Sequence, residues 1–192
     1  MNIYDFDGTI YDGDSTVDFF LFVLKNQPSL MRYLPRQAKG FLLYGLKRID
    51  KRQLKEHFFA FLAGIDTDKW LPAFWEQHAG KIYPWYSAQQ QADDVIISAS
   101  PEFLLQPICQ KLGINHLIAS RVDVRTGKFL GANCRGREKV VRLQEELGIA
   151  RCDQFYSDST SDLPLAQIAE QAFLIKKGQI TEWVVAESKI CP

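Results

Sequence analysis

The most constraining feature of this sequence is a pair of aspartates placed directly at the end of its first apolar segment. Residues 2–6, Asn-Ile-Tyr-Asp-Phe, are typical of a short strand, and an Asp-Gly-Thr turn over residues 7–9 follows. In open α/β sheets, ligands bind outside the carboxyl ends of the strands. We therefore expect this strand to be the first of an α/β sheet, with Asp5 and Asp7 on one side of it beside the ligand crevice.

A long helical stretch separates this strand from the rest of the expected sheet. Between residues 14 and 82 apolar residues recur at helical spacing, and no segment has a clear strand pattern. Asp14 or Ser15 can cap the first helix, and Pro28 interrupts it. Further helices are predicted from residue 29, over 41–49, over 54–64 and over 66–80.

Strand and helix patterns then alternate from residue 94 onward. Strands are predicted over 94–98, 116–119, 154–157 and 172–175, helices over 101–112, 138–147 and 163–169, and a hairpin over 122–130. Strands that alternate with helices indicate a parallel sheet with short crossovers. The predicted fold class is α/β, with a core split by a helical insertion after its first strand.

Composition excludes several classes of protein. The 23 Lys and Arg residues balance the 23 Asp and Glu residues, which argues against binding of nucleic acid over the whole surface. No apolar run approaches the roughly 18 residues that span a membrane, and the acidic start lacks a signal peptide's basic region. The four cysteines do not have the spacing of zinc ligands: Cys109, Cys134, Cys152 and Cys191. They favour a reducing compartment, so we predict a cytoplasmic protein. The sequence leaves open whether two of them form a disulfide.

The Asp5 and Asp7 pair suits nucleophilic and acid–base chemistry. One carboxylate can attack an electrophile while the other transfers a proton, and a divalent cation would relieve their mutual repulsion. The alternative is an acidic turn, because Asp and Gly are common turn residues. The Gly-Thr that follows, directly after the first strand, favours the functional interpretation.

Three further polar segments lie at strand ends or helix starts. Ser98-Ala99-Ser100 can bind an anion with hydroxyl and backbone N–H groups, although Ser100 before Pro101 also suits a helix cap. Lys139 opens a helix, where the macrodipole disfavours a cation unless an anion lies nearby; the alternative is an exposed helix lysine. Residues 157–162, Ser-Asp-Ser-Thr-Ser-Asp, offer oxygen ligands for Mg²⁺ or, alternatively, a capping loop.

In chain order, D-F-D-G-T, S-A-S, G-R-E-K and S-D-S-T-S-D resemble the four motifs of the haloacid-dehalogenase-like (HAD) superfamily. The helical insertion resembles its first cap type, and the phosphoserine-phosphatase-like subfamily IB is the most similar group. The stretch from Leu117 to Val140 further resembles bacterial phosphatidylglycerophosphate phosphatases. The resemblance covers nearly the whole chain. It implies a Rossmann-like parallel-sheet core of residues 1–13 and 83–192 with a helical cap domain of residues 14–82.

The resemblance also implies a role for each matching residue. Asp5 would be the nucleophile that forms an aspartyl-phosphate, and Asp7 the general acid and base. Mg²⁺ would be held by the Asp5 carboxylate, the Asp7 backbone carbonyl and Asp158. The other matching residues would act around the phosphoryl group: Ser98, Ala99 and Lys139 would bind it, Thr9 would orient the first loop beside it, and Asp162 would support the site.

Two positions depart from the pattern of the resembled family. The fourth motif commonly has Gly before its first Asp, and Ser157 stands there; we expect a small effect, because serine fits many turns. Phosphoserine phosphatases have a Glu nine residues after the nucleophile that helps to recognise the substrate amine. In this sequence the corresponding residue is Asp14, which is a candidate for substrate selection. The difference argues against phosphoserine as the substrate and leaves other small substrates open.

The predicted cap carries a strong positive charge. Residues 24–55 hold nine basic residues against the single acid Asp50, a net charge of +8, together with apolar residues such as Phe41 and Leu42. Basic and apolar residues on one helix can lie on an anionic membrane surface. The alternative is a solvated cap face with a normal core stripe, and no nucleic-acid partner is expected.

We therefore predict a Mg²⁺-dependent phosphomonoester hydrolase that acts on a phosphorylated small molecule or a lipid phosphate, cytoplasmic or peripheral at the inner membrane face. One alternative is a non-hydrolytic phospho-acceptor, against which Asp7 argues because a nearby base hastens hydrolysis. Another is a membrane-surface binding protein with an idle site. The histidines have no Ser or Cys partner at familiar spacing and are assigned structural or surface roles: His57, His78 and His116.

Overall fold

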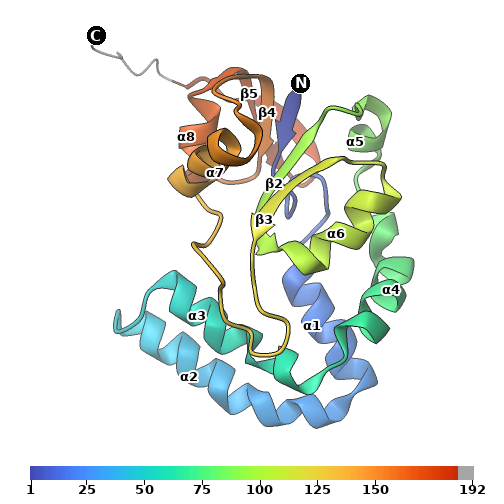
Figure 1. Ribbon diagram of the computed structural model, residues 1–192, viewed down its shortest axis with the longest axis vertical. Helices are drawn as coiled ribbons and strands as arrows, with labels where there is room; N and C mark the ends of the chain where they lie inside the picture. The colour runs from blue at the N-terminus through green and yellow to red at the C-terminus, as the bar shows by residue number, and fades with distance from the viewer. Residues whose placement is uncertain (186–192) are drawn as a thin grey trace.

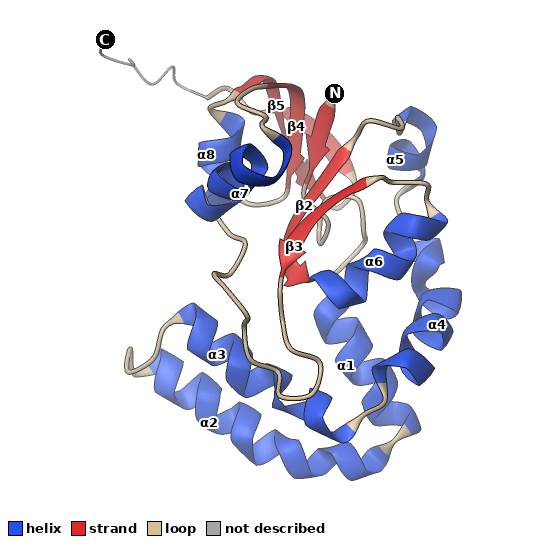
Figure 2. Cartoon of the chain, in the orientation of Figure 1, coloured by secondary structure: helices blue, strands red, loops and turns tan. Residues whose placement is uncertain are grey.

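A six-stranded sheet forms the centre of the computed structural model, which describes residues 1–185 (Figures 1 and 2). The sheet order is β3-β2-β1-β4-β5-β6, in which β1 to β5 are parallel and β6 pairs antiparallel with β5. The strands are β1 Asn2–Tyr4, β2 Val95–Pro101, β3 His116–Ser120, β4 Cys152–Ser157, β5 Ala169–Lys176 and β6 Gln179–Glu182. This Rossmann-like order places β1 at the point where the strand order reverses, which is where such sheets bind ligands.

Alternate residues of the strands enter two separate apolar layers. Ile3 and Phe155 belong to the layer beneath α7 (Arg137–Leu147) and α8 (Leu163–Ala166). Tyr4 and Tyr156 point to the other face, where their rings stack at 4.8 Å. Both faces of β1 and β4 are buried at these positions because helices cover each side of this parallel part of the sheet.

The segment between β1 and β2 is helical, as expected. Its elements are α1 Ser15–Asn26, α2 Leu34–Gly45, α3 Lys51–Phe58 and α4 Thr67–His78, with the 3₁₀ turns η1 Pro28–Tyr33, η2 Phe59–Gly64 and η3 Ala79–Lys81. The predicted helix from residue 29 is therefore a 3₁₀ turn before α2. A Cβ atom at Gly40 would lie 2.5 Å from the Cβ of His57, so this glycine lets α2 pack closely on α3.

The helices α1 and α4 pack directly on the sheet layer of Tyr4. One apolar cluster runs from that layer into both helices. The indole N–H of Trp75 on α4 donates to the carbonyl of Leu104 on α6 (Glu102–Lys111) at 2.7 Å. The division into a core of residues 1–13 and 83–192 and a cap of residues 14–82 stays a prediction.

Several boundaries differ from the predicted ones. The helix expected from Pro101 begins at Glu102, because Pro101 ends β2 and stands at the helix N-cap without a side-chain cap bond. The hairpin predicted over 122–130 is present but short: Val122 and Phe129 form an antiparallel bridge, and the Asp123 N–H donates to the Lys128 carbonyl at 2.8 Å. The helix α8 stops at residue 166, and β5 begins at residue 169 rather than 172. Two elements were not predicted: α5 Pro84–Gln89 and β6.

The structure also describes three of the four cysteines and the apolar character of the helices. Cys109, Cys134 and Cys152 are free and buried, while Cys191 lies outside the described residues. Within residues 1–185, no helix combines the length and the apolar character that crossing a bilayer requires.

Candidate active site

The turns that follow β1 and β4 are bound to each other. The Asp5 N–H donates to the carbonyl of Tyr156 at 2.9 Å, and the Asp158 N–H donates to the hydroxyl of Thr9 at 2.9 Å. Gly8 has a φ of +68°, and a Cβ atom there would lie 2.4 Å from Asp158 Oδ2. Glycine at this position therefore permits both the turn and the close approach of the Asp158 carboxylate.

Lys139 joins two of the acids. Its ammonium lies 3.0 Å from Asp5 Oδ1 and 2.6 Å from Asp162 Oδ2, and its side chain is only 1% exposed. Burial opposes the charged form, but the Asp5 and Asp162 carboxylates outweigh it and raise the pKa of Lys139. A lysine in the first turn of a helix is expected to have an anion nearby, and the two carboxylates provide it for Lys139.

Ser157 supports Asp162. Its hydroxyl donates to Asp162 Oδ2 at 3.0 Å and accepts the N–H of Ser159 at 3.1 Å. Asp162 Oδ1 is buried and has no hydrogen-bond partner among the residues that the structure describes. The serine that replaces the common glycine therefore adds a donor to a buried carboxylate, a contribution that the sequence did not suggest.

Asp7 is held by two serines. The N–H of Ser15, at the start of α1, donates to Asp7 Oδ1 at 2.6 Å, and the hydroxyl of Ser100 donates to Asp7 Oδ2. The interpretation of Ser100 as a helix cap is wrong, because the N-cap of α6 is Pro101 and Ser100 is turned toward Asp7. Only its place at a strand end could have indicated this contact.

Burial shapes the acidity of both aspartates. It raises the pKa of Asp5 to about 7 against the opposing charge of Lys139. It also raises the pKa of Asp7 to about 6, with a further contribution from the charge of Asp14, while the hydrogen bonds from Ser100 and Ser15 oppose the shift. A carboxyl group with a pKa near neutrality is well suited to gain and lose a proton during turnover.

The other expected site residues lie close to this centre in different ways. Ser98 is buried at the end of β2, and its hydroxyl accepts the N–H of Ser100 at 3.1 Å. The Ala99 carbonyl accepts a hydrogen bond from Lys55 at 2.7 Å. The Thr9 hydroxyl, bound to the N–H of Asp158, fits a loop-orienting role better than direct phosphoryl contact.

Asp14, the expected determinant of substrate choice, is the N-cap of α1. Its Oδ1 accepts the N–H groups of Thr16 and Val17, both at 3.0 Å. Ser15, the alternative cap, instead donates its own N–H to Asp7. One oxygen of Asp14 therefore caps the helix, while the charge of its carboxylate contributes to the raised pKa of Asp7.

A basic group on α3 reaches the site, which the sequence did not reveal. The ammonium of Lys55 also donates to Asn133 Oδ1 at 3.2 Å, and burial together with the charge of Lys51 lowers the pKa of Lys55 to about 8. Burial and the charge of Arg135 lower the pKa of Lys51. Arg135 donates in turn to the hydroxyl of Ser161 at 3.3 Å. Lys51 and Lys55 on α3, together with Arg135, are here called the α3 cation cluster, and the charges of Asp7 and Asp14 act on Lys55.

The acids around Asp5 fit a magnesium ion. In residues 1–185, Asp5 Oδ2 has no hydrogen-bond or ion-pair partner, and the Asp158 carboxylate forms no ion pair. No three His, Cys, Asp or Glu side chains converge in that range, so the protein would offer two carboxylates and the Asp7 carbonyl. Mg²⁺ binds through few carboxylates and keeps several waters, which matches this set.

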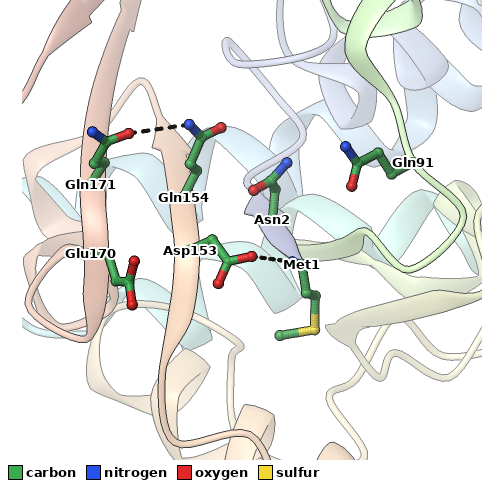
Figure 3. A pocket seen from close by; sticks show the side chains of 7 residues that line it. All are labelled: Met1, Asn2, Gln91, Asp153, Gln154, Glu170 and Gln171. Carbon is green, nitrogen blue, oxygen red and sulfur yellow. Dashed lines mark hydrogen bonds and ion pairs between the residues drawn. The ribbon is translucent and has the colours of Figure 1, made fainter.

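The opposite edge of the sheet has no comparable arrangement. A pocket of about 600 Å³ lies there. Figure 3 shows the side chains that line it: Met1, Asn2, Gln91, Asp153, Gln154, Glu170 and Gln171. Gln154 donates to Gln171 at 3.2 Å, and the amine of Met1 pairs with Asp153. Both acids of this pocket are exposed, and within residues 1–185 neither forms an ion pair with a lysine.

The sequence model of the haloacid dehalogenase-like hydrolase family matches residues 3–167, a range that contains all four motifs. The chain belongs to this family. The assignment agrees with the placement of Asp5, Lys139 and Asp162 at the strand-order reversal, where a HAD hydrolase would hold its substrate.

Two relatives of this HAD hydrolase extend the comparison. Protein CicA of Caulobacter vibrioides is 30% identical over 198 residues, which cover 92% of this chain and 86% of that protein. A probable phosphatase of Mycobacterium tuberculosis is 26% identical over 213 residues, with 95% and 73% covered. The family makes the chain a hydrolase, and the second of these relatives is named as a probable phosphatase.

A solved structure shares the fold. A protein of unknown function from Bordetella pertussis Tohama I superposes with a TM-score of 0.70 at 23% sequence identity, and the match covers 90% of this chain and 87% of that one. This likeness concerns the fold, and it includes the helical segment because so much of both chains is matched.

Proposed function

We propose that this HAD hydrolase is a Mg²⁺-dependent phosphomonoester phosphatase that works through a phosphoryl group carried on Asp5. The observation that carries the proposal is the contact of 3.0 Å between the Lys139 ammonium and Asp5 Oδ1, in a site where Asp5 Oδ2 is left without a partner in residues 1–185. One oxygen of the nucleophile is fixed, and the carboxylate remains able to attack.

The proposed reaction has two displacements at phosphorus. In the first, a carboxylate oxygen of Asp5 forms a bond to phosphorus, the bond to the leaving oxygen breaks, and Asp7 gives that oxygen its proton. In the second, Asp7 takes a proton from water, the water oxygen attacks phosphorus, and the bond to Asp5 breaks. Inorganic phosphate leaves, and both aspartates return to their starting states.

The surrounding residues stabilise charge on the transferred group. Ser98 and Ala99 lie at the end of β2, and Lys139 presents its ammonium beside Asp5, so hydroxyl, backbone and ammonium donors can reach phosphoryl oxygens. Asp5, Asp158 and the Asp7 carbonyl would hold Mg²⁺, which would add to the positive charge of Lys139 beside the phosphoryl group. Asp162, held by Ser157, keeps Lys139 in position.

We further propose that the leaving group carries a negative charge of its own. The charges of Asp7 and Asp14 act on Lys55, and the charge of Asp14 acts on Lys51, so two members of the α3 cation cluster lie within electrostatic range of these acids. Lys55 is half-buried and bonded to the core at Ala99. A carboxylate or a second phosphate on the substrate would compensate these cations, and both a soluble metabolite and a lipid phosphate offer such a group.

The test is hydrolysis of 4-nitrophenyl phosphate by the purified protein with Mg²⁺ and with excess chelator. The proposal expects turnover with Mg²⁺ only, and loss of turnover in Asp5→Asn. Asp153→Asn, an exposed acid at the opposite edge of the sheet, is the matched control and should keep full activity. Full activity in chelator would refute the metal requirement, and full activity of Asp5→Asn would refute the nucleophile.

A further inference from the structure

The helix α2 turns its apolar side chains outward. Its buried residues are a glutamine and a glycine: Gln37 donates to the Phe58 carbonyl at 2.9 Å, and Gly40 lies against His57. The residues on the other side of the helix, and Leu46 directly after it, are exposed and mostly apolar. We call this surface the outer face of α2: Leu34, Ala38, Phe41, Leu42 and Leu46.

This arrangement is the reverse of an ordinary amphipathic helix, which buries its apolar side against the core. Leu42 is 64% exposed, Leu46 57% and Phe41 56%, and Met31 in the preceding turn is 59% exposed. Figure 1 shows α2 along the end of the molecule that is remote from the sheet, with α3 between it and the sheet. Contiguous exposed apolar patches of this kind mark interaction sites.

Positive charge surrounds the outer face of α2. Exposed bases lie in the preceding turn, on the helix and directly after it: Arg32, Arg36, Lys39, Lys47 and Arg48. No acidic residue occurs in the sequence between Asp18 and Asp50. All charged residues of this stretch of the sequence are therefore basic.

We propose that the outer face of α2 docks on an anionic membrane surface, with the helix lying in the plane of the interface. A bilayer with acidic headgroups offers apolar tails to Leu42 and Leu46 and negative charge to the flanking bases. A second copy of the same face would bring equal positive charges together, and a nucleic acid would leave the leucines in water. The docking does not depend on the chemistry proposed at Asp5.

The test is flotation of the full chain with vesicles of phosphatidylcholine alone and of phosphatidylcholine with phosphatidylglycerol. Binding is expected only to the anionic vesicles, and it should weaken at high salt. Leu42→Asp with Leu46→Asp should lower vesicle binding roughly tenfold or more, because it removes the buried apolar contact. Arg36→Glu with Lys39→Glu should lower it by a similar factor.

Two matched double variants act as controls. Leu130→Asp with Val184→Asp changes two exposed apolar residues outside α2, and Lys111→Glu with Arg151→Glu reverses two exposed bases outside it. Both should bind vesicles as the wild type does, and all four variants should keep their aryl phosphatase rate, which confirms folding. Absence of wild-type binding, or equal loss in controls and α2 variants, would overturn the proposal. So would a dimer that the leucine variants abolish.

Discussion

Ser100 donates its hydroxyl hydrogen to the Asp7 carboxylate, and this bond links the end of β2 to the turn after β1. The same hydroxyl lies 3.1 Å from Thr16 on α1, so three segments meet at one oxygen. Asp7 is thereby fixed in orientation at the place where the proposed proton transfers occur.

Replacement of Ser100 by alanine should lower kcat for an aryl phosphate by roughly tenfold to a hundredfold, because a hydrogen bond to a charged group contributes about 1.5–3 kcal/mol. The change affects the orientation of Asp7 and should leave KM nearly unchanged. Ser100→Thr should recover much of the rate, and Ser87→Ala, an exposed serine on α5, should have none of this effect. A wild-type kcat in Ser100→Ala would contradict the role given to this bond.

Lys55 gives the clearest pH dependence. Its pKa of about 8 means that the ammonium is charged at pH 7 and mostly neutral at pH 9. KM for 4-carboxyphenyl phosphate should therefore rise across this range relative to KM for phenyl phosphate, which has no second anion. Lys55→Arg should flatten the rise, since arginine stays charged, and Lys55→Met should show a high KM at every pH. Identical pH profiles for the two substrates would contradict an anionic leaving group.

Gly8 controls the approach of Asp158 and therefore the proposed metal site. In Gly8→Ala the added Cβ atom would lie 2.4 Å from Asp158 Oδ2, so that carboxylate must move. The Mg²⁺ concentration for half-maximal activity should rise roughly tenfold or more. Gly113→Ala is the matched control. Gly113 also has a positive φ, of +72°, but has open space around it, so this variant has the backbone strain of Gly8→Ala without the contact with a carboxylate. An unchanged Mg²⁺ requirement in Gly8→Ala would count against Asp158 as a ligand.

Ser157 should contribute to stability through Asp162. Ser157→Ala removes a donor from a buried carboxylate, and the free energy of unfolding should fall by about 1–3 kcal/mol. Urea denaturation of this variant beside Ser87→Ala gives the comparison, since Ser87 is exposed. Equal stability of the two variants would show that the serine only fills the place of the common glycine.

The fold was predictable where a physical pattern was strong. Short apolar runs separated by helical periodicity defined the five parallel strands, and the acids at the end of the first strand defined the edge that carries the site. The strand β6 was missed because all four of its residues are exposed and lack an apolar pattern. The short α5 was missed because its six residues provide too few turns for a periodic signal.

The site was predictable residue by residue only within the motifs. Lys139 at a helix start was selected only because the other polar clusters accompany it, and the structure places it between two carboxylates. Lys55 was one of nine bases in a helical segment, and nothing in the sequence separates it from the others. Its role depends on the way α3 lies over the end of β2, where it bonds to Ala99, 44 residues away in the chain.

The proposed reaction requires that phosphorus becomes bonded to Asp5, and acid quenching during turnover would trap this intermediate. Mass spectrometry of the quenched protein should find a phosphoryl group on the peptide that contains Asp5, labile to hydroxylamine as an acyl phosphate is. The group should be absent from Asp5→Asn and present in Asp153→Asn. A phosphoryl group on another residue, or steady hydrolysis by Asp5→Asn at the wild-type rate, would contradict the account.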